Sequence, residues 1–117
     1  MRGPRLARQR TMAAVARRLA DGAAEDWFTA IGTSMTPTVR AVQRVRLRPP
    51  VPGEALVRAV VLVRVGGRWW LHRVVDEAAG RVLVAGDNGM VNGWTERTDV
   101  AGVLLPWDRR RTGRPVS

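Results

Sequence analysis

The sequence contains no cysteine and no lysine, and it has a single histidine. Without cysteine, neither a disulfide framework nor a thiolate metal site can form. Without lysine, no deprotonated side-chain amine can act as a base, because arginine stays protonated. One histidine leaves only carboxylates as further metal ligands. We therefore expect no metal and no other cofactor.

Long apolar runs are also missing. No stretch approaches the ~20 apolar residues that a membrane-spanning helix needs, and residues 1–22 lack the apolar run of a secretory signal. We expect no transmembrane segment, and a location in the cytoplasm or peripheral at the inner face of the membrane. The net charge of +10 attracts polyanions and anionic lipid headgroups.

A chain of 117 residues is long enough for one small domain with a modest core. Its hydrophobic fraction of 45% is rich in valine, which favours β structure. We divide the chain into a basic N-terminal helix at residues 1–24, a core at 25–108 and a basic, flexible tail at 109–117.

The first segment shows helical spacing. Apolar residues recur at one helix face, and Gly22 follows as a stop; the apolar positions are Met12, Val15, Ala16 and Leu19. Such a helix either covers the core or lies on a membrane surface. Its small, alanine-rich apolar face favours the first interpretation.

From Trp27 onward the pattern is that of strands. Gly66-Gly67 is typical of a tight hairpin, and the prolines of 49–53 belong outside a ladder. The fold we expect is a small, mostly antiparallel β domain with an N-terminal helix. Its predicted strands are 26–32, 44–48, 55–65, 68–77, 81–86 and 100–107.

Ser34 lies in the turn "GTSMTPT", and the only other serine is Ser117. A serine becomes a nucleophile when a neighbouring base takes its proton, and His72 is the only imidazole in the chain. On a strand, His72 shares a face with Trp70, whose ring would partly desolvate the imidazole and favour its neutral form. Taken singly, the two residues are typical of a turn cap and a half-buried strand histidine. Together they predict a nucleophile and its base.

The segment "GTSMTPTV" resembles the glycine-x-serine-methionine-x-proline-threonine signature of the signal peptidase I superfamily, which includes the LexA-like self-cleaving repressors. Three further blocks follow in the family's order, "VPGEALV", "LHRVV" and "GDN". The resemblance spans roughly residues 27–105. It implies a signal peptidase/LexA-like β barrel, here as a minimal soluble core without the anchor or the large accessory domain of many relatives.

Histidine is the base in the archaeal and endoplasmic-reticulum branch, where the common bacterial branch has lysine, and "LHRVV" is similar to the former. The resemblance thus implies Ser34 as nucleophile and His72 as general base. Asp87 of "GDN" either orients the base or braces the turn, and Glu96 and Asp99 are the alternative acids. Backbone amides of Gly32–Ser34 would form the oxyanion hole, with Thr33 and Met35 in the same turn.

The implied activity is that of a serine endopeptidase that cleaves a precursor or signal peptide through an acyl-enzyme. Its partner would be a peptide or preprotein bound as an added strand, with a peripheral membrane contact and without nucleic acid. The alternative is an inactive domain of this fold that binds nucleic acid or an anionic membrane through its arginines. A LexA-like repressor is a poorer third interpretation, since it needs a lysine base. The sequence leaves open the substrate, cleavage in cis or in trans, and the oligomeric state.

Overall fold

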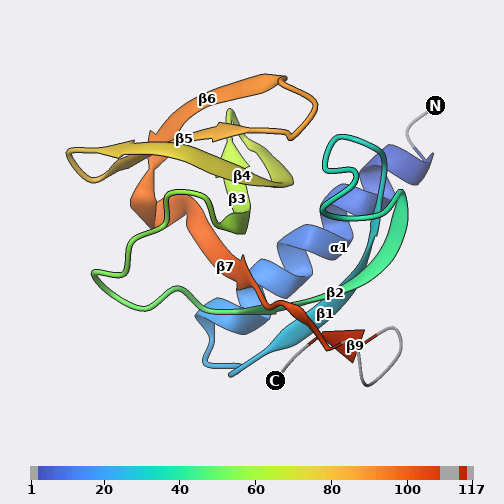
Figure 1. The fold of residues 1–117 in the computed structure, drawn as a ribbon. Coiled ribbons are helices and arrows are strands. Elements are labelled where there is room, and N and C mark those ends of the chain that lie inside the picture. The colour runs from blue at the N-terminus through green and yellow to red at the C-terminus, as the bar shows by residue number, and fades with distance from the viewer. Residues whose placement is uncertain (1–2, 109–113, 116–117) are drawn as a thin grey trace.

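The computed structural model describes residues 3–108 and 114–115. Helix α1 (Gly3–Ala20) precedes a seven-stranded antiparallel sheet, and this confirms the expected mainly β fold with an N-terminal helix (Figure 1). Most of the predicted tail at 109–117 lies outside the described residues. The sheet strands are β1 (Asp26–Ile31), β2 (Val42–Arg48), β3 (Val60–Val65), β4 (Arg68–Ala78), β5 (Arg81–Ala85), β6 (Val91–Glu96) and β7 (Val100–Leu104).

The strand order is β1-β2-β7-β3-β4-β5-β6, so β7 joins the β1–β2 pair to the other four strands. Two short elements, β8 (Trp107–Asp108) and β9 (Arg114–Pro115), pair separately. Among the described strands β1 and β6 are edges that do not pair with each other, so the sheet is open and the expectation of a barrel was wrong. Helix α1 contacts β1, β4 and β7, and its buried residues belong to the core on one face of the sheet.

The two faces of the sheet bury two separate cores. Along β3, Val60 and Leu62 belong to the core that includes the helix, whereas Val61, Val63 and Val65 belong to the second core. This division follows from strand alternation, because successive side chains point to opposite faces. Since β4 pairs with β3 in register, its residues divide between the same two faces.

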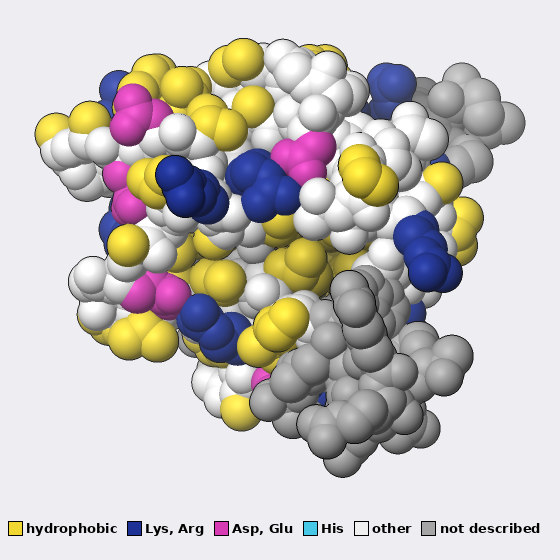
Figure 2. Space-filling model, in the orientation of Figure 1, with side chains coloured by type: hydrophobic (Ala, Val, Ile, Leu, Met, Phe, Trp, Pro, Cys, Tyr) yellow, Lys and Arg dark blue, Asp and Glu magenta, His cyan; other side chains and the backbone are white. Residues whose placement is uncertain are grey.

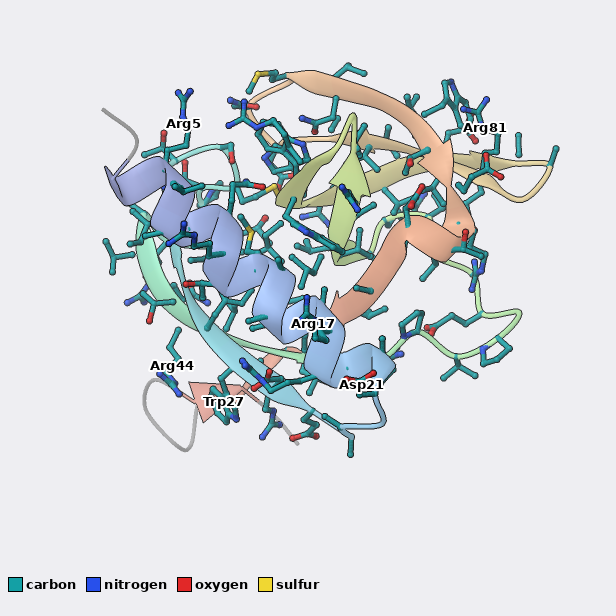
Figure 3. The ribbon with its side chains drawn as sticks, turned by 180° about the vertical axis from the view of Figure 1, so that it is seen from behind. Arg5, Arg17, Asp21, Trp27, Arg44 and Arg81 are labelled. Carbon is teal, nitrogen blue, oxygen red and sulfur yellow. The ribbon has the colours of Figure 1, made fainter. Side chains whose placement is uncertain are left out.

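Helix α1 packs on the core, as the first of the two interpretations predicted. Val15, Ala16 and Leu19 are all buried, and Figure 3 shows the helix lying across the strands. The helix ends where expected: Gly22 has φ +112°, and the Ala23 N–H donates to the Arg18 carbonyl at 3.0 Å. No helix among the described residues is both long and apolar enough to cross a membrane.

The predicted strands are present, with three differences. The strand predicted at 100–107 ends at Leu104, and Trp107 belongs to the separate β8–β9 pair. β3 begins only at Val60, because the Leu56 and Val57 amides donate to the Glu77 carboxylate at 2.8 and 3.0 Å instead of joining a ladder. β6 was not predicted at all. Its segment "VNGWTE" contains asparagine and glycine, which are depleted in strands.

The helix–sheet core depends on Leu19, which is 3% exposed. We expect Leu19→Ala to lower the free energy of unfolding by about 2–5 kcal/mol, because it removes buried methyl groups and leaves a cavity. Urea denaturation followed by circular dichroism measures this. Leu6→Ala, on the same helix but 39% exposed, is the control and should change stability little. Equal effects of the two variants would contradict the packing of α1 described above.

Candidate active site

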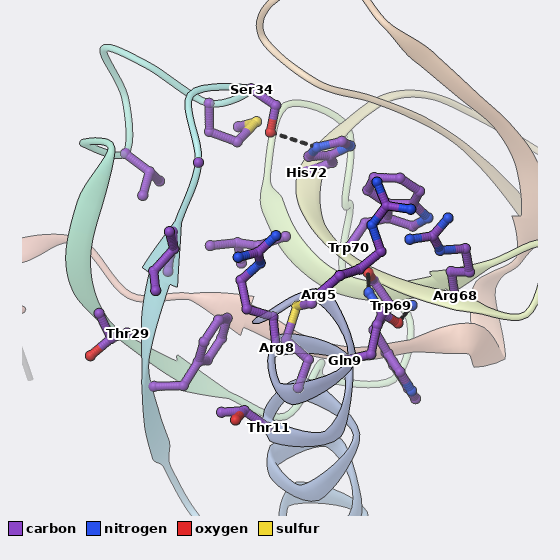
Figure 4. Close-up of a pocket in the computed structure, with 18 of the residues that line it drawn as sticks. Arg5, Arg8, Gln9, Thr11, Thr29, Ser34, Arg68, Trp69, Trp70 and His72 are labelled. Carbon is purple, nitrogen blue, oxygen red and sulfur yellow. Dashed lines mark hydrogen bonds between the residues drawn. The ribbon is translucent and has the colours of Figure 1, made fainter. Parts of the chain in front are cut away.

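Ser34 and His72 are in hydrogen-bond contact, with 2.9 Å between Ser34 Oγ and His72 Nε2 (Figure 4). Ser34 lies in the loop that joins β1 to β2, and His72 lies in the middle of β4. His72 is only 2% exposed, and no histidine is visible on the face drawn in Figure 2. The two residues that the sequence singled out are thus brought together from separate elements.

The Ser34 loop is held in place at its base and at its centre. The Gly32 N–H donates to the Ala41 carbonyl at 2.8 Å, and Gly32 has φ +126°, a conformation that favours glycine. Met35 and Val39 are buried and anchor the loop in the helix-side core. The loop therefore presents the Ser34 hydroxyl on a fixed backbone.

The opposite nitrogen of the imidazole is also fixed. His72 Nδ1–H donates to the amide oxygen of Asn92, with 2.5 Å between Nδ1 and Oδ1. With the proton held on Nδ1, the lone pair of Nε2 is directed at the Ser34 hydroxyl. Asn92 was missed by the sequence reasoning, which looked for a carboxylate in this role.

Asp87 braces the turn, which is the second of its two predicted roles. Its carboxylate accepts from Arg73 Nε at 2.8 Å, from Arg73 Nη2 at 2.9 Å and from the Thr38 hydroxyl at 2.8 Å. Its own N–H donates to the Met35 sulfur at 3.4 Å. Asp87 therefore ties the Ser34 loop to β4, and it makes no hydrogen bond to His72 within the described residues.

Glu96 and Asp99, the other candidate acids, are engaged elsewhere. Glu96 pairs with Arg81 at 3.0 Å, and Asp99 accepts from the Thr95 hydroxyl at 2.6 Å. Both lie at the turn between β6 and β7 and belong to its local hydrogen-bond network. Neither orients His72.

The "GDN" segment packs directly against the Ser34 loop. The Asn88 N–H donates to the Ser34 carbonyl at 3.1 Å. A Cβ placed on Gly86 would lie 3.1 Å from that same carbonyl oxygen and 2.7 Å from Asn88 Oδ1. Glycine at position 86 is what permits this close approach.

The electrostatics of the site favour a neutral base. Burial lowers the pKa of His72 below its ordinary value of 6.5, although the Asn92 hydrogen bond and the charge of Asp87 oppose this shift. The hydrogen bonds from Arg73 hold the pKa of Asp87 below 3.8, so this carboxylate stays charged. At neutral pH the imidazole is therefore ready to accept a proton.

The expected oxyanion hole needs one correction. The Gly32 amide is bonded to Ala41 and is removed from the set of donors. The Thr33 and Ser34 amides have no partner among residues 3–108 and 114–115, so they are the donors available near the Ser34 hydroxyl. Met35 is 4% exposed and contributes to the anchoring of the loop.

A cavity of about 740 Å³ opens beside Ser34 and His72. It runs between α1, β1 and β4, and both apolar and polar side chains line it (Figure 4). Three arginines, Arg5, Arg8 and Arg68, also line it. Among the described residues, no group of histidine and carboxylate side chains could hold a metal ion.

No family model, curated protein or solved structure matches this chain. What the site can do is therefore inferred from its own geometry. A hydroxyl, an imidazole and a side-chain amide stand in hydrogen-bonded order beside an open cavity, which is an arrangement suited to nucleophilic catalysis.

Because His72 is the only histidine, its ring protons give a single pH titration by NMR in the untagged protein. We expect its midpoint below 6.5, and lower still in Asn92→Leu, which removes the acceptor but keeps the site dry. His72 binds its proton more weakly in the folded protein than in the unfolded chain, because its pKa is lowered on folding. The protein should thus lose stability as the pH falls from 6.5 towards the folded pKa. A midpoint at or above 6.5 would contradict this account of the site.

Proposed function

We propose that this chain is a serine endopeptidase in which Ser34 is the nucleophile, His72 the general base and Asn92 the residue that orients the base. One observation carries the proposal: the 2.9 Å contact between Ser34 Oγ and a His72 imidazole whose other nitrogen donates to Asn92. The resemblance to the signal peptidase superfamily supports it independently and implies a precursor or signal peptide as the substrate.

In the first step, His72 Nε2 accepts the Ser34 proton as Oγ bonds to the carbonyl carbon of the scissile peptide. The carbonyl electrons move to oxygen, and the Thr33 and Ser34 amides stabilise this oxyanion by up to ~3 kcal/mol per donor. His72 then gives its proton to the departing amine as the C–N bond breaks. In the second step His72 takes a proton from the water that attacks the ester carbonyl. His72 then returns this proton to Ser34 Oγ as the acyl C–O bond breaks and the acid leaves.

Asn92 suits a base that must stay neutral before reaction. Its amide fixes the Nδ1–H tautomer without adding a negative charge that would raise the pKa of His72 strongly. The imidazolium that forms during reaction is stabilised instead by the more distant carboxylate of Asp87, whose charge already acts on His72. Orientation and charge stabilisation are thus divided between two residues.

A peptide substrate is favoured by the open side of β4 next to His72. The backbone groups of Trp69, Leu71 and Arg73 point away from β3, and pairing with β5 begins only at Arg73. Leu71 therefore offers its N–H and C=O to an added strand in the cavity. Such a strand would carry its scissile carbonyl past Ser34.

Two experiments test the dyad. A fluorophosphonate probe should label Ser34 in the wild type, and mass spectrometry of peptide mixtures should reveal cleavage. We expect Ser34→Ala and His72→Gln to lose both signals while they keep the native circular dichroism spectrum. Asn92→Ala should reduce the rate about tenfold, the equivalent of one hydrogen bond or ~1.4 kcal/mol.

Thr98→Ala, which removes an exposed hydroxyl away from the site, is the matched control and should behave as the wild type. Cleavage by Ser34→Ala at the wild-type rate would exclude the dyad. A folded wild type that neither reacts with the probe nor cleaves any peptide would instead favour the inactive binding domain.

We also propose a peripheral contact with an anionic membrane, made by apolar side chains beside the site. Ile31 and Val42 face each other across the β1–β2 pair at 54% and 67% exposure, and Met90 and Val91 are 49% and 62% exposed. Ile31 and Met90 both line the cavity. Apolar groups in a basic surface are suited to the boundary of an anionic bilayer.

Sedimentation with phosphatidylserine vesicles tests this contact. The double variant Ile31→Ser/Val42→Ser should reduce binding about tenfold. Val51→Ser/Val57→Ser, which changes two exposed valines outside the cavity, should leave binding unchanged. Equal binding by both double variants would contradict the proposed contact.

A further inference from the structure

The cavity beside Ser34 is lined by three arginines and by no carboxylate. Arg5 and Arg8 reach it from α1, and Arg68 reaches it from the start of β4 (Figure 4). None of the three pairs with an acidic side chain among residues 3–108 and 114–115. One end of the cavity therefore carries positive charge that the described chain does not compensate.

Gln9 closes the open side of β4 at this same end. Its side-chain Nε2 donates to the Trp69 carbonyl at 2.8 Å, and the Trp69 N–H donates to its Oε1 at 2.7 Å. The amide thus satisfies the two backbone groups that an added strand would otherwise bond. A peptide that pairs with Leu71 cannot continue along β4 past Trp69.

The arginines surround the point at which such a peptide leaves the strand. Arg5 lies one helical turn before Gln9, Arg8 adjoins Gln9, and Arg68 adjoins Trp69. The guanidinium of Arg68 stacks over the Trp70 ring, 5.5 Å from its centroid, and this contact holds it at the rim. An anionic group on the departing peptide would meet all three cations.

We propose that the cavity selects peptides with an acidic residue about three to five positions from the cleaved bond. His72 and Arg68 are four residues apart on β4. An added strand has the same rise of ~3.3 Å per residue as β4, so it also advances by about four residues between these two positions. The inference rests on the proposed endopeptidase function and adds the substrate class to it.

Binding is measured first, with the Ser34→Ala variant so that the peptide is not consumed. The probes are two fluorescein-labelled, alanine-based decapeptides that differ only in carrying a Glu-Glu or a Gln-Gln pair. By fluorescence anisotropy we expect the Glu-Glu peptide to bind about tenfold more tightly. That preference should disappear when Arg5→Gln, Arg8→Gln and Arg68→Gln are added.

The matched control adds Arg10→Gln, Arg17→Gln and Arg64→Gln to Ser34→Ala. These arginines do not line the cavity, and both triple changes lower the net charge from +10 to +7, since 10 − 3 = 7. The control should keep the acidic preference. Equal binding of the two peptides by Ser34→Ala would overturn the proposal. Equal loss of the Glu-Glu preference in the two triple variants would also overturn it, because the preference would then come from overall charge.

Cleavage profiling separates this inference from the proposed function. Peptides cut by the wild type should be enriched in Asp or Glu three to five residues from the cut, on one side of it, and the Arg5/Arg8/Arg68 triple variant should lose the enrichment. Cleavage without acidic enrichment would refute the inference and leave the endopeptidase in place. Selective binding without any cleavage would keep the acidic site and refute the endopeptidase.

Discussion

The hydrogen bond between Ser34 and His72 depends on an ion pair that lies beside it. Arg73, the residue after His72, holds Asp87 through two nitrogens, while Asp87 also accepts from Thr38 in the Ser34 loop. Strand alternation explains why one short segment serves both purposes. His72 points to one face of β4 and contacts Ser34, whereas Arg73 points to the other face and holds the Ser34 loop through Asp87.

The separate placement of His72 and Arg73 explains why the imidazole is neutral while the Asp87 carboxylate is charged. A carboxylate bonded directly to His72 would raise the pKa of the imidazole and favour its charged form. Here the carboxylate of Asp87 is bonded to Arg73, and a neutral amide contacts the ring instead. Burial then dominates and keeps the base neutral. In a chain without lysine, arginine supplies the fixed cation, and histidine supplies the proton acceptor of the proposed dyad.

The sequence was informative where residues are rare or periodic, and less so where contacts are long-range. Ser34 and His72 stood out because each is almost unique in the chain, and α1 was visible in its helical spacing. Asn92 was hidden because its strand has low β propensity, and because an asparagine carries no catalytic signal until its partner is known. The open edges of the sheet follow from the long-range order of the strands, which no local pattern encodes. The bond between Gly32 and Ala41 likewise spans the whole loop.

Helix α1 belongs to the core of the fold and also lines the candidate site, a second role that the sequence did not indicate. Its buried face completes the core through Val15 and Leu19, and two turns earlier Gln9 occupies the free backbone groups of Trp69. Trp69 belongs to the strand that carries His72. A shift of the helix that broke the Gln9 bonds would leave the Trp69 N–H and C=O free for the proposed added strand. The packing that stabilises the domain would therefore also set where a peptide, bound as proposed, leaves the sheet, and it places Arg5 and Arg8 beside the cavity.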